Sequence, residues 1–293
     1  MQKIGFILLA FVMSLSLQAQ ENTEIFLFEI KTTPTTVDIV NGKNISQNAG
    51  YDNQPSFYDG NTLLYSRTQD SLTAIGIYDI TTSRNSIFTN EPNSGYFSPQ
   101  RIPNSETIVA VRQDPEGRQR LAQYNFKTKA FKKLLDSSQV GYFSFYDKHT
   151  FIASVLQPNQ MDLFLINSEN ETSENIITNS GRSLQKVPNS NSMSYTVENE
   201  TQNMDLYTLD FSGDEPTSYF VCEMPIGRQD YTWLDENRIL VGSGDSLFVY
   251  DLFGEPAWTF AASLNSYGLK NITRMTVSPN GKYLAVAAEP VEN

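Results

Sequence analysis

Hydrophobic and polar positions along the chain follow the two-residue alternation of β-strands rather than the 3.6-residue period of helices. Short apolar runs, such as 63–65, 108–111 and 239–241, are separated by polar turns rich in Asn, Asp, Ser and Gly. Such runs, bounded by turn residues, are typical of strands and hairpins. No stretch of a dozen residues after position 20 shows helical periodicity, so the pattern predicts an all-β chain.

One pattern occurs six times: an Asp or Asn in a turn, followed four positions later by an apolar residue in a strand. Successive apolar anchors are 45, 43, 42, 46 and 45 residues apart. A nearly constant period in this range is the signature of four-stranded propeller blades. The six pairs are Asp59/Leu63, Asn104/Ile108, Asp147/Phe151, Asn189/Met193, Asp235/Ile239 and Asn280/Leu284.

The two ends of the chain carry the two halves of one repeat. Residues 25–40 supply only the third and fourth strands of a blade, and residues 272–288 supply only the first and second. Pairing of these halves satisfies the edge strands that an open array leaves exposed. We therefore predict a six-bladed β-propeller of four-stranded blades, a single domain over residues 21–293. Its ring is closed by N-terminal strands that pair with C-terminal strands.

The first twenty residues have the pattern of a cleaved secretory signal peptide. Lys3 precedes an apolar run over 4–17 and a short polar end, with cleavage expected after Ala19 or Gln20. The alternative is a retained anchor or a buried N-terminal helix. No cysteine follows the run, so lipid attachment is not expected. We predict an exported bacterial protein, periplasmic or secreted and not a lipoprotein, without membrane insertion of the mature chain.

Two segments carry a resemblance to a known family. Residues 55–65 have the sequence PSFYDGNTLLY, and residues 278–285 have the sequence SPNGKYLA. Both resemble the repeat P-S-F-S-P-D-G-K-x-I-x-F of TolB-type six-bladed propellers with WD-repeat-like units. The resemblance covers the propeller part, essentially the whole mature chain, and not the α/β domain that precedes the propeller in TolB itself. It implies the fold and leaves the function open, because such propellers serve as scaffolds, receptors and occasionally enzymes.

The composition of the chain limits the partners and metal sites that it can have. The chain has 33 acidic and 21 basic residues, a net charge of -12, one cysteine and one histidine. This balance does not offer the basic face that a nucleic acid requires, so no nucleic-acid partner is expected. Single copies of His and Cys exclude His-pair and thiolate-cluster metal sites. We expect Cys222 to be a buried, inert thiol and His149 to be a solvated turn residue.

The sequence contains no recognisable catalytic constellation. Residues 242–245 (GSGD) lie between two apolar runs and are interpreted as a hairpin turn rather than a nucleophile elbow. We therefore expect no catalytic residues, no cofactor and no metal. Carboxylates are plentiful, however, so a carboxylate- or calcium-dependent propeller enzyme (a lyase, a lactonase or a glycan hydrolase) stays open as the alternative.

One recurrent position is a candidate binding site. The residue after the opening Gly of a repeat is a tyrosine or an arginine in five blades, and an arginine stands close to the equivalent place in the sixth. In a closed propeller these loops surround one mouth of the channel, and Tyr and Arg are enriched at binding hot spots. The alternative is that the side chains pack between adjacent blades. The six residues are Tyr51, Tyr96, Tyr142, Arg182, Arg228 and Arg274.

These observations together predict a function in recognition. We expect an exported, non-catalytic binding or scaffold propeller that recognises an envelope or secreted protein, or a glycan, at one channel mouth. Stoichiometric bound calcium or manganese would instead favour the enzyme. A purely structural partner in an envelope assembly is a third class, which would tolerate mutations at the mouth.

Overall fold

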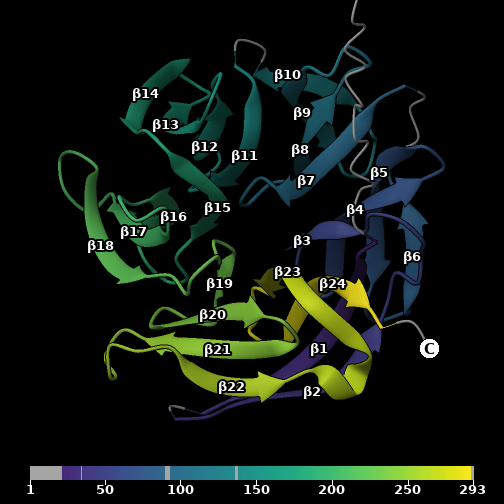
Figure 1. The fold of residues 1–293 in the computed structure, drawn as a ribbon. Helices are drawn as coiled ribbons and strands as arrows, with labels where there is room; N and C mark the ends of the chain where they lie inside the picture. Colours follow the sequence, from purple (N-terminus) through teal and green to yellow (C-terminus); the bar gives the residue numbers. More distant parts are fainter. Residues whose placement is uncertain (1–21, 34, 90–92, 136–137, 292–293) are drawn as a thin grey trace, which may run out of the picture.

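The computed structural model describes residues 22–33, 35–89, 93–135 and 138–291; the expected signal peptide lies outside these residues. Within them, 24 strands form six sheets of four antiparallel strands around a central axis (Figure 1). The helical structure assigned there is one 3-10 turn, Asn265–Tyr267, and none of it is long and apolar enough to cross a membrane. The predicted six-bladed propeller is confirmed.

Each blade runs from an inner strand beside the axis to an outer strand at the rim (Figure 1). Blade 1 contains β3 (Asn53–Phe57), β4 (Thr62–Gln69), β5 (Leu72–Asp79) and β6 (Arg84–Ile87). Blade 2 contains β7 (Gly95–Arg101), β8 (Thr107–Gln113), β9 (Gln119–Asn125) and β10 (Phe131–Leu135). Blade 3 contains β11 (Val140–Phe145), β12 (Thr150–Leu156), β13 (Met161–Asn167) and β14 (Thr172–Ile177).

The second half of the ring repeats the same order. Blade 4 contains β15 (Ser180–Lys186), β16 (Ser192–Glu198), β17 (Met204–Asp210) and β18 (Thr217–Glu223). Blade 5 contains β19 (Tyr231–Trp233), β20 (Arg238–Ser243), β21 (Ser246–Asp251) and β22 (Thr259–Ser263). Blade 6 contains β23 (Leu269–Val277), β24 (Tyr283–Pro290), β1 (Glu24–Thr32) and β2 (Val37–Asn44).

Burial along each strand explains this order. In β4, three successive residues, Leu63, Leu64 and Tyr65, are all fully buried, because both faces of a second strand pack against neighbouring blades. In the outer strand β14, by contrast, the first four residues are exposed. Continuous apolar runs therefore mark the second strands, whereas outer strands are mostly polar.

The core is divided into six apolar clusters, which lie between adjacent blades. The cluster between blades 1 and 2, for example, joins Leu64 and Ile75 to Tyr124. Large rings require space beside them: a Cβ on Gly76 would lie 2.7 Å from Cζ of Tyr65. Full burial of one large apolar side chain contributes roughly 1.5–3 kcal/mol. These clusters therefore supply much of the stability between blades.

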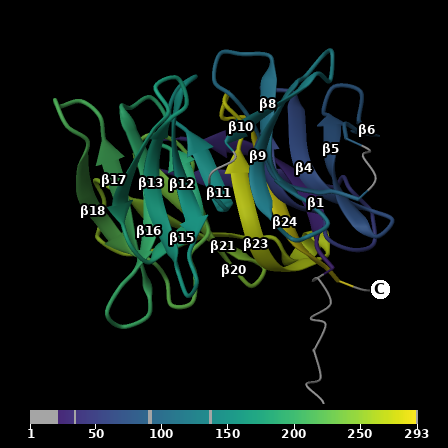
Figure 2. The same cartoon turned by 90° about the horizontal axis from the view of Figure 1, so that it is seen from above.

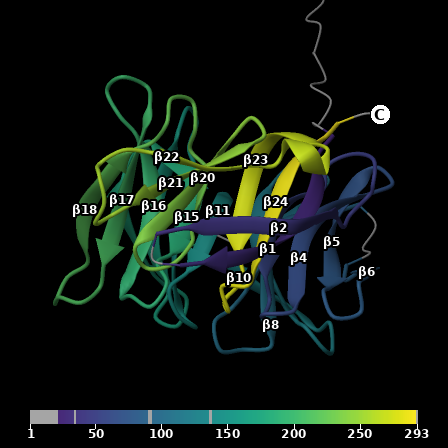
Figure 3. The same ribbon diagram turned by 90° about the horizontal axis from the view of Figure 1, so that it is seen from below.

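The ring is closed by strands from opposite ends of the chain, as predicted. β1 pairs antiparallel with β24, from Glu24 opposite Ala288 to Glu29 opposite Tyr283. Figure 3 shows these two strands side by side in one sheet with β23 and β2. Thr23 then joins blade 6 to blade 1, since its N–H donates to the carbonyl of Gly50 at 3.0 Å.

The repeated turn is held by a side-chain oxygen, which does not always belong to the Asp or Asn of the repeat. In blade 1, Oδ1 of Asp59 accepts bonds from the N–H groups of Asn61 and Thr62 at 2.9 and 2.8 Å, and Asp147 and Asp235 act in the same way. In blades 2 and 4 the residue after the expected Asn accepts instead. Asn104 and Asn189 adopt left-handed φ values of 55° and 51°, and the hydroxyls of Ser105 and Ser190 accept the bond.

The single cysteine and the single histidine lie apart from each other. Cys222 is 4% exposed in the cluster between blades 4 and 5, and burial raises the pKa of its thiol to about 12. The thiol is therefore protonated and unreactive at neutral pH. His149 is half-buried in the turn over 147–150, and its backbone N–H donates to Asp147.

Candidate functional site

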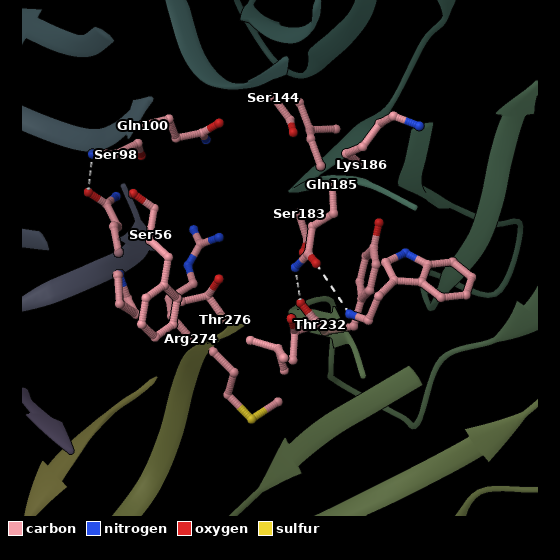
Figure 4. Close-up of a pocket in the computed structure, with 18 of the residues that line it drawn as sticks. Ser56, Ser98, Gln100, Ser144, Ser183, Gln185, Lys186, Thr232, Arg274 and Thr276 are labelled. Atoms are coloured by element: carbon pink, nitrogen blue, oxygen red, sulfur yellow. Dashed lines mark hydrogen bonds between the residues drawn. The ribbon is translucent and has the colours of Figure 1, made fainter. Parts of the chain in front are cut away.

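A polar cavity of about 570 Å³ occupies the centre of the ring, where the inner strands of all six blades meet (Figure 4). Two of these inner strands, β11 and β23, are seen near the middle of the ribbon in Figure 2. Hydroxyl and amide side chains from every inner strand line its wall. These are Ser56 (β3), Ser98 and Gln100 (β7), Ser144 (β11), Ser183 and Gln185 (β15), Thr232 (β19) and Thr276 (β23). The channel therefore offers one polar surface to which each blade contributes.

Side-chain amides join neighbouring inner strands, which belong to different sheets and share no backbone ladder. Nε2 of Gln100 donates to the carbonyl of Phe143 in blade 3 at 2.6 Å. Gln185 of blade 4 donates to the carbonyl of Tyr231 and accepts the N–H of Trp233 at 3.3 Å, both in blade 5. These bonds satisfy backbone groups that would otherwise face the channel unpaired, and they hold the wall in place.

Two arginines share one carboxylate at the end of the channel where the inner strands begin. Nε of Arg182 lies 3.0 Å from Oδ2 and 3.3 Å from Oδ1 of Asp230, and Nη2 also donates to Oδ2. Nη1 of Arg274 lies 2.8 Å from Oδ1 of the same carboxylate. Asp230 directly precedes β19, so this Arg182–Asp230–Arg274 cluster connects blades 4, 5 and 6.

The cluster carries an excess of positive charge. Its side chains are only 36%, 14% and 16% exposed for Arg182, Asp230 and Arg274. The channel wall as a whole has four cationic side chains, the other two being Arg101 and Lys186, and Asp230 is the one carboxylate among its residues. The chain has a net charge of -12. The channel is therefore a positive region in an acidic molecule, and such a region attracts anions.

Two tyrosines complete this mouth. The guanidinium of Arg274 lies 5.1 Å from the ring centroid of Tyr142, within the range of a cation–π contact. The phenol of Tyr51 interacts electrostatically with Arg274 and with Arg182, and burial raises its pKa to about 12. The ring of Tyr142 therefore lies beside the guanidinium of Arg274, in the combination of aromatic and arginine side chains that is typical of binding hot spots.

Five of the six residues predicted for the mouth lie at this end. Arg182 and Arg274 pair with the Asp230 carboxylate, and Tyr142 lies against Arg274. Tyr51 is close enough for the charges of all three to act on its phenol. Arg228 lines a second, smaller cavity that also contacts Arg182 and Arg274.

Tyr96 lies elsewhere. It is 1% exposed in the cluster between blades 1 and 2, where its ring meets that of Tyr124 edge-on at 6.0 Å. The strand register shifts between Phe97 and Gln100, and Ser98 has a left-handed φ of 49°. This irregularity turns Ser98 towards the channel (Figure 4) and leaves Tyr96 between the blades. The packing alternative therefore describes Tyr96.

The sequence analysis did not identify Asp230, although a fixed position in the repeat leads to it. In each blade one inner-strand residue pairs with the apolar anchor of the repeat, for example Trp233 with Ile239 and Val277 with Leu284. Counting three positions back from that residue gives one ring of side chains around the channel. Its members are Gln54, Ser98, Tyr142, Ser183, Asp230 and Arg274.

The cations at the opposite end of the channel are differently engaged. Arg101 donates to the carbonyls of Ser105 and Tyr58 at 2.7 and 2.9 Å. Nζ of Lys186 donates to the carbonyl of Ser190 and extends away from the cavity in Figure 4. Backbone carbonyls therefore occupy these donors, and the Arg182–Asp230–Arg274 cluster is the better placed for an anion.

Potential metal ligands are dispersed. Among residues 22–33, 35–89, 93–135 and 138–291, no group of three or more His, Cys, Asp or Glu side chains is close enough to hold a metal ion.

The fold is similar to that of several solved proteins, although no family model and no curated protein matches the chain. A putative TolB from Agrobacterium tumefaciens has a TM-score of 0.68 at 10% identity, over 92% of this chain and 99% of that one. TolB from Acinetobacter baumannii has a TM-score of 0.59 at 9% identity. The present chain has the fold of a TolB-type propeller.

These TolB-like structures differ in how much of their length is matched. The alignment covers 92% of the present chain but only 65% of the A. baumannii TolB. An oligogalacturonate lyase from Vibrio parahaemolyticus is also similar, with a TM-score of 0.56 at 12% identity, over 87% of this chain and 83% of that one. Since propellers with different names share this architecture, the likeness establishes the fold alone.

Proposed function

We propose that the chain is a non-catalytic binding propeller, and that the channel mouth around Asp230 is its binding surface. The observation that carries the proposal is the Arg182–Asp230–Arg274 cluster at the end of a polar cavity. The partner is a protein segment or a glycan that enters the mouth. Export to the periplasm or the exterior, without a lipid anchor, belongs to the same proposal.

The geometry favours recognition because its donors are already ordered. Asp230 holds both guanidinium groups, and the ring of Tyr142 lies against Arg274. Side chains that are fixed before binding lose little conformational entropy when a partner arrives, so more of the contact energy appears as affinity. Arg182 is the more exposed of the two arginines, at 36%, and can contact a partner first.

The mouth also has the composition of an interaction hot spot. It combines two tyrosines with arginines, next to the hydroxyl groups of Ser98 and Ser183 in the wall. Arginine and tyrosine give large contact area together with directed polar groups, and hydroxyls adapt to donors or acceptors. The likeness to the putative TolB structure supports the proposal only through the shared propeller architecture.

The test is a capture experiment with three baits. The chain from residue 21 onward is immobilised as wild type, as the mouth variant Arg182→Ala/Tyr51→Ala, and as the rim variant Arg84→Ala/Tyr219→Ala. Arg84 and Tyr219 are exposed on outer strands, so the rim variant removes the same residue types away from the channel. Captured proteins and glycans are identified by mass spectrometry, and circular dichroism verifies that each bait is folded.

The proposal predicts a partner that the wild type and the rim variant retain and the mouth variant releases, with affinity at least about tenfold weaker. A partner that all three baits hold equally would place the contact elsewhere and overturn the assignment of the mouth.

A further inference from the structure

A second, smaller cavity lies beside the channel, between blades 5 and 6. Its volume is about 100 Å³, and three arginines line it: Arg182, Arg228 and Arg274. Asp230 is the one carboxylate among the residues that line it. The Arg182–Asp230–Arg274 cluster thus separates the small cavity from the channel, because its members line both spaces.

The charge around this cavity is not balanced. Arg182 and Arg274 share the single charge of Asp230. In the described part of the chain no carboxylate forms an ion pair with Arg228, whose backbone N–H donates to the carbonyl of Pro225. The residues that line this partly enclosed space therefore carry three guanidinium groups and one carboxylate. Partial burial of unpaired charge is costly, and a bound counter-ion removes the cost.

The chemistry of the lining selects the kind of counter-ion. A guanidinium group presents planar, paired donors that match the oxygens of phosphate, sulfate and carboxylate groups. Arginines from three separate segments line this cavity, so one ion with several oxygens can bond to more than one of them. A halide has a single acceptor centre and cannot use the paired geometry. The cavity also has the size of a small ion rather than of a polymer.

We propose that this small cavity binds a single oxyanion, a phosphate, sulfate or carboxylate group, with Arg228 as the residue that confers the binding. The proposal rests on the small cavity and its charges, and not on the partner proposed for the channel. Arg182 and Arg274 contribute to both sites, but Arg228 lines only the small cavity. Substitution of Arg228 therefore addresses the oxyanion site alone.

The test is isothermal titration calorimetry on the purified chain, without any partner, at constant ionic strength set by sodium chloride. One arm titrates sodium phosphate. The other titrates N-acetyl-glycylglycine, whose single charge is a terminal carboxylate, so the two arms distinguish a free inorganic ion from a chain end. We expect saturable binding in at least one arm, and binding in either supports the proposal.

Three variants make the result specific. Arg228→Ala should weaken the observed binding at least about tenfold, which is the effect expected from loss of a charge-assisted bond to an anion. Arg228→Lys keeps the charge without the planar fork and should recover only part of the affinity. Arg84→Ala, a substitution of an exposed arginine on β6, should bind like the wild type.

Two results would overturn the proposal. One is the absence of saturable binding of both probes to the wild type. The other is an affinity in Arg228→Ala equal to that of the wild type. Neither result bears on capture of a partner by the channel mouth, so failure here and failure of the proposed function are distinguishable.

Discussion

Nη1 of Arg274 and Oδ1 of Asp230 lie 2.8 Å apart, although the two residues are 44 positions apart in the chain. The contact joins the first residue before β19 to the middle of β23, at the same level of the channel. It also positions Arg274 over Tyr142, on the far side of the mouth. One ion pair therefore fixes the relative placement of blades 3, 5 and 6 at the proposed binding surface.

Removing the charge of Asp230 should destabilise the ring. The substitution Asp230→Asn keeps the size of the side chain but leaves Arg182 and Arg274 without a counter-charge in a partly buried place. We expect a loss of about 1–3 kcal/mol in the free energy of unfolding. Equilibrium unfolding in urea measures it, with Asp70→Asn, an exposed loop substitution, as the control. An unchanged midpoint would show that the carboxylate does not stabilise the mouth.

Because β1 closes the ring, substitution of one buried residue in this strand should strongly lower the stability of the protein. Phe28 is fully buried, and its ring meets Tyr267 edge-on at 5.1 Å. Phe28→Ala should cost about 3–5 kcal/mol, because it opens a cavity in the blade that joins both chain ends. Phe253→Ala is the matched control, since that ring is 84% exposed. Thermal unfolding should separate the two variants clearly, and equal midpoints would contradict the structural role of β1.

Stability should fall at alkaline pH. Burial raises the pKa of Tyr51 and of Tyr65 from 10.0 to about 12, so the folded state holds these protons more tightly than the unfolded state. The contribution is complete below pH 10 and is lost as the pH rises through about 12. Urea unfolding at several pH values and tyrosinate absorbance measure both effects. Titration of every tyrosine near pH 10 in the folded protein would contradict the assigned burial.

Partner binding should not require a metal. We expect extensive dialysis against a chelator to leave capture of the partner unchanged, since the proposed contacts come from Arg182, Arg274 and Tyr51. Metal analysis of the purified chain accompanies the assay. Loss of capture with chelator, restored by calcium or manganese, would instead favour the enzyme class.

The architecture could be predicted from the sequence because the same pattern recurs in every blade. The apolar anchors at 63, 108, 151, 193, 239 and 284 fall in second strands that are buried on both faces, so the same signal recurs in every blade. The split blade was also visible, since residues 25–40 and 272–288 each lacked half of a repeat. Strand pairing at the ring closure follows from that count.

The site could be predicted only in part from the sequence, because the pairing of the inner strands is irregular. The opening Gly of a repeat does not keep a fixed distance from the channel: the register shifts at Asn53–Ser56, at Phe97–Gln100 and at Ser180–Leu184. Counting from the Gly therefore selected Tyr96, which packs between blades, and passed over Asp230. Counting back from the partner of the apolar anchor places Asp230 and Arg274 at one level. Ion pairing between them depends on how blades 5 and 6 pack against each other, which no local pattern encodes.

Hydrogen–deuterium exchange of the chain, with and without its captured partner, tests the assignment of the mouth most directly. The account predicts slower exchange on binding in the segments that begin the inner strands, over 180–184, 227–232 and 271–276, with outer strands such as β14 and β18 unchanged. Protection confined to the outer strands, with these three segments unaffected, would contradict it.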